Sequence, residues 1–167
     1  MPAIRCTEKL LKEVGVKPAS AEEVGAATWH ANLVWLEHRK HVLFCADETL
    51  FCCVTPPVRR SEIRSLNELL LSSLEWTMRA VGYREELIAR FVSRHETMAI
   101  TGTRSRSVVG SMNDYVFHFK SLVEWHGGWA NCDLAEIVTQ LNDIPQVPRD
   151  FHNSCEALRE KLEREVA

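Results

Sequence analysis

Three short apolar runs between residues 29 and 55 constrain the fold more than any other part of the chain. Polar segments at 37–40 and 46–49 separate these runs, which are Ala31–Leu36, His41–Cys45 and Leu50–Thr55. Runs of this length, rich in branched and aromatic residues and joined by short polar turns, predict a three-stranded antiparallel meander. Apolar residues stand at both alternating positions of the strands, so helices must pack on the sheet.

The segments on either side of the meander have a mainly helical period. Met98–Thr103 is predicted as a further strand, and Ala3–Thr7 as a strand or an extended lead-in to a short helix. From apolar spacing and stop residues we expect helices at about 8–14, 61–82, 84–95, 108–126, 133–142 and 154–166. The predicted fold class is α+β: a small, mainly antiparallel sheet, with the meander at about 30–55 plus one or two further strands, packed against about five or six helices.

Length and composition are those of one folded domain. The chain has 167 residues, of which 46% are hydrophobic, and this is a normal amount of core-forming material for a domain of that size. There is no internal repeat and no linker long enough to divide the chain. We therefore predict a single domain over residues 1–167.

Charge is nearly balanced along the chain. Twenty Lys and Arg against 23 Asp and Glu give a net charge of −3. This argues against an extended nucleic acid or a membrane as partner, because both are bound through surplus cationic charge. No apolar run approaches the roughly 20 residues of a membrane-spanning helix. The charged N-terminal segment lacks an apolar signal region, so a cytoplasmic location is expected.

The six cysteines are expected to be reduced and mostly buried. They stand at 6, 45, 52, 53, 132 and 155, three of them in very apolar runs where a thiol behaves as a small hydrophobic group. No C-x-x-C pair occurs, and His38 and His41 are separated by two cations. We expect no metal site, and the sequence identifies no cofactor.

The richest polar stretch is the segment 101–114, which runs from a loop into a helix. Its arginines Arg104 and Arg106 and its hydroxyl groups, such as that of Ser107, precede or begin the helix, with Asn113 further along. The free N–H groups of a helix start suit an anion, and an arginine adds a planar fork of donors. The alternative is ordinary capping by Ser105 or Ser107 with solvated arginines.

Residue types of a hydrolytic triad also occur on this helix. Ser111, Asp114 and His118 share one helical face, and Asp114 can bond His118 directly. Ser111 and His118 are nevertheless two turns apart, a rise of ~10 Å, so a nucleophilic Ser111 needs a base from elsewhere, such as His30 or His41. The alternative is a polar helix face without chemistry.

The meander supplies further candidate ligand-binding residues. Trp29, His30 and Asn32 begin its first strand, and Arg39 and Lys40 are placed in a turn. An indole at a sheet end can stack on an aromatic ligand, and a histidine titrates near neutral pH. Trp29 as an ordinary core residue is the alternative.

Several blocks together resemble an uncharacterised bacterial family classed as a domain of unknown function. The blocks are R-C-T-x-K-L-L from 5, W-H-A-N-L from 29, R-K-x-V-L-F from 39, T-L-F from 49, R-S-V-x-G-S-M-N-D from 106 and L-N-x-I-P from 141. The resemblance covers most of the chain. It implies a small cytosolic bacterial protein and supplies no activity, cofactor or catalytic residue.

Three functional hypotheses follow. In the first, the 101–114 segment and the Trp29–Asn32 sheet end form one cleft for a small anionic ligand, a nucleotide or phosphoester, with ligand-binding residues Trp29, Asn32, Arg39, Lys40, Arg104, Arg106, Ser107 and Asn113. In the second, the protein is a hydrolase of esterase or phosphodiesterase type, with Ser111, His30 and Asp114 as catalytic residues and the helix start as oxyanion site. In the third, it is a non-catalytic interaction module or a homodimer that associates through the long Ile63–Val81 helix.

Overall fold

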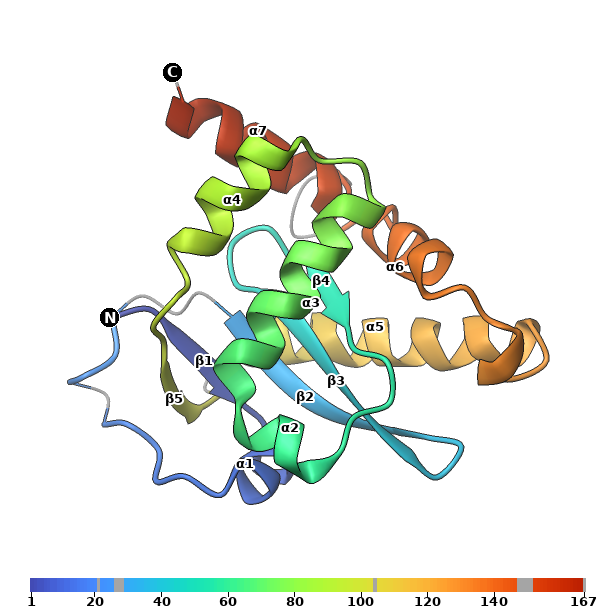
Figure 1. The fold of residues 1–167 in the computed structure, drawn as a ribbon, viewed down its shortest axis with the longest axis horizontal. Coiled ribbons are helices and arrows are strands. Elements are labelled where there is room, and N and C mark those ends of the chain that lie inside the picture. The colour runs from blue at the N-terminus through green and yellow to red at the C-terminus, as the bar shows by residue number, and fades with distance from the viewer. Residues whose placement is uncertain (21, 26–28, 104, 147–151, 167) are drawn as a thin grey trace.

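A computed structural model of the chain describes residues 1–20, 22–25, 29–103, 105–146 and 152–166 (Figure 1). The strands are β1 (Ala3–Cys6), β2 (Trp29–Leu36), β3 (Arg39–Ala46), β4 (Cys52–Val54) and β5 (Ala99–Gly102). The helices are α1 (Glu8–Val14), α2 (Arg60–Arg64), α3 (Leu66–Ala80), α4 (Glu85–Ser93), α5 (Arg106–Trp125), α6 (Leu134–Asn142) and α7 (Ser154–Val166), with a 3-10 turn at Trp129–Asn131.

The five strands form one mixed sheet in the order β4-β3-β2-β1-β5. The predicted meander is confirmed, because β2, β3 and β4 pair antiparallel. The prediction of a mainly antiparallel sheet is wrong in its other half, since β1 pairs parallel with both β2 and β5. The chain passes from β1 to β2 through α1, and it reaches β5 from β4 through α2, α3 and α4. Sequence periodicity carries no information about such distant pairing.

Helices cover both faces of the sheet. Figure 1 shows α3 in front of the strands and α5 behind them. The front core takes side chains from α1, α3, α4 and α7, and the rear core from α5 and α6. Alternation along β2 sends Trp29, Ala31 and Leu33 to the front core and Val34 to the rear. His30 and Asn32 therefore face α5.

The single helix predicted over 61–82 is two helices, which is why the described residues hold seven α-helices where about five or six were expected. Ser65 leaves helical geometry with φ −96° and ψ 52°, and its N–H donates to the Glu62 carbonyl. The apolar side chains Ile63 and Leu66 lie on both sides of this break and are both buried. The helical spacing of apolar residues thus continues across Ser65, so the sequence pattern does not show the break there.

The outer edge of β4 is closed by a side chain. Asn142, at the end of α6, accepts from the Cys52 N–H at 2.9 Å and donates to the Cys52 carbonyl at 2.9 Å. It is fully buried and also accepts from the Ser154 hydroxyl at 2.8 Å. This gives a structural role to the Asn of the 141–145 block.

The cysteines are mostly buried, as expected: Cys6, Cys45, Cys52 and Cys53 lie in the interior. Burial raises the pKa of Cys6 and of Cys53 to about 12, so both stay protonated. No helix within the described ranges is long and apolar enough to span a membrane.

Candidate functional site

The first half of α5 borders a groove of about 430 Å³ on the rear side of the molecule. Across the groove stand Ile144, Pro145 and Gln146, which follow α6. The helix contributes Arg106, Ser107, Gly110, Ser111, Asp114, Tyr115 and His118. The sequence places 107, 111, 114 and 118 on one helical stripe, and the groove runs along that stripe.

The helix start at one end of the groove is capped by Ser105. Its side chain accepts from the Val108 N–H at 3.3 Å, and its backbone is extended. The capping alternative is therefore correct for Ser105. Ser107 and Arg106 lie in the first turn, are exposed and remain available to a ligand beside the positive end of the helix dipole.

Gly110 lies in the second turn of α5, beside the groove-lining Ser107 and Ser111, without a packing reason. A Cβ atom built at this position meets nothing within 4 Å, and its φ lies outside the left-handed region. A glycine inside a helix costs about 1 kcal/mol relative to alanine. The cost has no compensation within the described fold, and the missing side chain leaves the helix backbone open to the groove.

Tyr115, in the wall of the groove, is hydrogen-bonded to two other segments. The Tyr115 hydroxyl donates to the Leu50 carbonyl at 2.8 Å and accepts from Gln146 Nε2 at 3.1 Å. Burial raises the pKa of Tyr115 far above its ordinary value, so the phenol stays protonated. Tyr115 thus ties the groove to the turn after β3.

Near the same end of α5, His30 joins two side chains from distant segments. Its Nδ1 lies 3.0 Å from Thr103 Oγ1, and its Nε2 lies 3.2 Å from Asp47 Oδ1. The ring is fully buried, whereas the Asp47 side chain is 34% exposed and Thr103 is half-buried. Burial lowers the pKa of His30, an effect that Asp47 opposes and Arg5 reinforces.

The acceptor character of Asp47 sets the proton positions on the ring. A carboxylate only accepts, so Nε2 carries the hydrogen and Nδ1 accepts from the Thr103 hydroxyl. This is the order of an acid, a base and a hydroxyl in a nucleophilic triad. Sequence reasoning named His30 but missed Thr103 and Asp47, which stand 73 and 17 residues away from it.

The chain connects the His30 cluster with the α5 groove. Thr103 follows β5 and precedes the Ser105 cap by two residues. Asp47 lies in the same turn as Leu50, which accepts from Tyr115 in the groove wall. Among the described residues no hydrogen bond joins Ser111 to a histidine, so the base proposed for a nucleophilic Ser111 is not in place.

Other candidate ligand residues lie apart from the groove. Trp29 is fully buried in the front core, on the sheet face opposite to α5. Asn32 faces α5, and its side-chain oxygen accepts from the Thr7 hydroxyl at 2.9 Å. Asn113 is exposed on α5 and does not line the groove. Arg104 lies outside the described residues. The expectation of one cleft with the Trp29 end of the sheet is therefore not met.

Arg39 and Lys40 begin β3 at the opposite end of the meander. The turn itself is Glu37–His38, with φ of 48° and 62°. Lys40 donates to Glu13 at 2.9 Å and lies over the Trp35 ring at 5.2 Å. Both cations border a second groove of about 520 Å³, in which Trp35 and not Trp29 supplies the indole.

Metal-binding groups do not converge. Within the residues that the structure describes, no three His, Cys, Asp or Glu side chains gather as a metal site would require. Among the described residues, the α5 groove and the His30 cluster offer hydroxyls, the guanidinium of Arg106, carboxylates and a neutral histidine.

Fold and site define an α+β protein in which a mixed five-stranded sheet supports a polar helical groove. The chain belongs to the family described as Domain of unknown function (DUF6933), whose model matches residues 3–157. Comparisons with curated proteins and with solved structures gave no match.

Proposed function

We propose that the protein binds a small phosphoester, such as a nucleotide, in the α5 groove. The observation that carries the proposal is Gly110, an unpacked glycine in the second turn of α5, where the helix lines the groove. A glycine kept at a cost to helix stability is expected where a ligand approaches the backbone closely.

The polar groups along the groove match the two halves of such a ligand. Arg106, Ser107 and Ser111 carry hydrogen-bond donors and lie toward the positive end of the helix, where a phosphate is favoured. Asp114 lies further along the helix and carries hydrogen-bond acceptors, which suit the hydroxyls of a sugar. Ile144 and Pro145 provide an apolar wall for a ring.

A thermal-shift screen tests this proposal. Nucleoside monophosphates, sugar phosphates and inorganic phosphate are added to the wild type, to Arg106→Gln and to Asn113→Ala. A ligand at 100 times its Kd stabilises the native state by about 2.7 kcal/mol, which raises Tm by several degrees. We expect the rise in the wild type and in Asn113→Ala, a control on the same helix, and its loss in Arg106→Gln. No rise with any phosphoester, or an equal rise in Arg106→Gln, would contradict the proposal.

The His30 cluster favours a second function, ester hydrolysis. The Thr103 oxygen would attack the acyl carbon or phosphorus of an ester while its proton passes to His30 Nδ1. The leaving alcohol takes that proton, and water then cleaves the covalent intermediate by the same route. Asp47 orients the ring and stabilises its charged form.

Turnover of a nitrophenyl carboxylic ester and of a nitrophenyl phosphate diester tests this function. Thr103→Val keeps the shape of the side chain and removes the hydroxyl, so it should abolish turnover, whereas Thr103→Ser should retain it. Ser111→Ala distinguishes the two hydroxyls and should be active. Full activity in Thr103→Val rules out the His30 cluster as the catalytic centre.

A further inference from the structure

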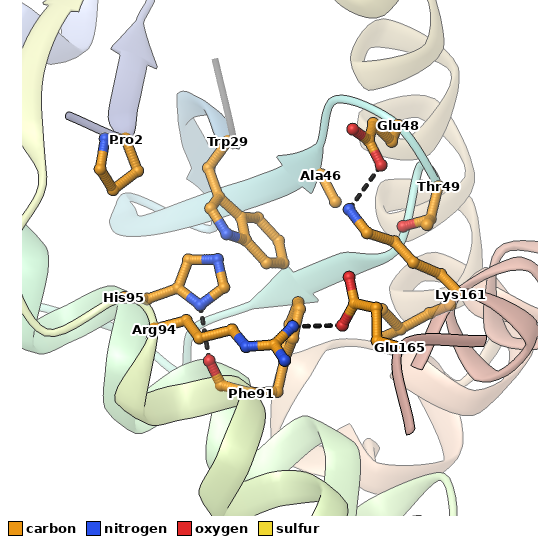
Figure 2. A pocket seen from close by; sticks show the side chains of 11 residues that line it. Pro2, Trp29, Ala46, Glu48, Thr49, Phe91, Arg94, His95, Lys161 and Glu165 are labelled. Atoms are coloured by element: carbon orange, nitrogen blue, oxygen red, sulfur yellow. Dashed lines mark hydrogen bonds and ion pairs between the residues drawn. The ribbon is translucent and has the colours of Figure 1, made fainter. Parts of the chain in front are cut away.

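A separate cavity of about 210 Å³ lies on the front side of the sheet (Figure 2). Trp29 of β2 forms its inner wall, Phe91 and His95 come from α4 and its end, and Leu158 comes from α7. The turn after β3 closes a further side. The sheet separates this cavity from the α5 groove, so it is independent of the function proposed above.

The indole of Trp29 presents an unused donor there. Trp29 is fully buried, and its Nε1–H has no hydrogen-bond partner among the described residues. A buried N–H without a partner costs roughly 1–3 kcal/mol. Figure 2 shows the indole nitrogen on the side of the ring nearest His95, and the two rings meet edge to face with centroids 6.1 Å apart.

His95 presents an unused acceptor beside it. Its Nδ1 lies 2.7 Å from the Phe91 carbonyl and must donate to it, which leaves a lone pair on Nε2. Burial lowers the pKa of His95, and the cations Lys161 and Arg94 lower it further, so the ring is neutral at pH 7. The cavity thus places one donor and one acceptor on adjacent walls.

The charged groups at the mouth neutralise one another. Arg94 pairs with Glu165 and Lys161 pairs with Glu48, which ties α7 to the end of α4 and to the turn after β3 (Figure 2). Partly exposed ion pairs of this kind contribute little stability and can open without unfolding. The two pairs leave no surplus charge at the mouth to attract an ionic ligand.

We infer that this cavity binds a small neutral heterocycle whose edge carries a hydrogen-bond acceptor next to a donor. Lactam and carboxamide rings of pyrimidine or nicotinamide size have such an edge: the carbonyl accepts from Trp29 Nε1–H, and the ring or amide N–H donates to His95 Nε2. Pockets that hold drug-sized ligands measure about 300–1,000 Å³, so a cavity of about 210 Å³ suits one small ring. Phe91 and Leu158 supply apolar contact with its faces.

Proton–nitrogen NMR of the indole groups tests the inference, because each tryptophan gives one indole signal. Uracil and nicotinamide are titrated into the wild type, and Trp29→Phe assigns the signal of Trp29. We expect that signal to shift in a saturable way while that of Trp35, which lies elsewhere, stays fixed. Trp29→Phe should weaken binding roughly tenfold, the value of about one hydrogen bond.

Two controls separate this cavity from other sites. 1,3-Dimethyluracil lacks the N–H donors and should bind more weakly than uracil, while Trp35→Phe should bind like the wild type. Added inorganic phosphate should not compete, since it belongs to the α5 groove. An unmoved Trp29 signal at millimolar uracil and nicotinamide, or equal affinity in Trp29→Phe, would overturn the inference.

Discussion

The three buried histidines, His30, His41 and His95, differ in their hydrogen-bond partners. His41 and His95 each place Nδ1 on a backbone carbonyl, of Thr55 at 2.8 Å and of Phe91 at 2.7 Å. His30 instead bonds two side chains, a carboxylate and a hydroxyl. The first arrangement fixes a ring in the core. The second leaves a neutral base beside a half-buried hydroxyl, which is why His30 is the residue with catalytic potential.

All three rings make stability depend on pH in the same direction. Burial is the largest cause lowering each pKa, so the folded rings stay neutral while unfolded histidines protonate below about pH 6.5. The unfolded state then binds more protons, so stability is present above pH 6.5 and is lost as the pH falls. Urea unfolding at pH 7.5, 6.5 and 5.5 should show this loss.

The matched variants for that measurement are His41→Gln and His118→Gln. His118 is exposed on α5, so its replacement should leave the pH dependence unchanged, whereas replacement of the buried His41 should reduce it by the share of one ring. A stability that stays constant from pH 7.5 to 5.5 would refute the neutral buried state of these rings.

Sequence periodicity predicts elements well where one face of an element is buried against a neighbour. It predicted the meander, the long α5 and the Asp133 cap of α6, whose side chain accepts from the Ala135 N–H. It did not predict the parallel position of β1 or the kink at Ser65. These depend on pairing across the chain and on a single backbone angle, neither of which changes the apolar period.

The residues of the candidate site on α5 could be predicted from the sequence, but the side chains that contact His30 could not. Ser107, Ser111 and Asp114 follow from helical spacing alone. The Thr103 and Asp47 contacts of His30 arise only when β5 and the turn after β3 reach the same end of the sheet. Gly110 stands inside a recognised block, but only the structure shows that no atom fills the space beside it.

At the scale of elements, α6 protects the free edge of β4 through one side chain. Asn142→Leu would leave the buried N–H and carbonyl of Cys52 without partners, so unfolding free energy should fall by roughly 3 kcal/mol. Gln140→Ala, at an exposed position of the same helix, should change it by less than about 0.5 kcal/mol. Urea unfolding at neutral pH compares the two, and equal stability of both variants would show that Asn142 does not seal the edge.

At the scale of the molecule, one sheet separates two candidate binding places. The front cavity is the smaller and has paired charges at its mouth, whereas the rear groove is the larger and runs along a helix. Helices on both faces hold the sheet between two cores. The two places can therefore bind different ligands, and a variant in one is expected to leave the other intact.

The titration of a stabilising phosphoester into Gly110→Ala tests the central claim most directly. Alanine fits the helix and improves its propensity by about 1 kcal/mol, so the free variant should have a Tm equal to or above that of the wild type. Its methyl group enters the groove, so calorimetry should show affinity at least tenfold weaker, while Asn113→Ala binds normally. Higher stability together with unchanged affinity would contradict a ligand site against the backbone of α5.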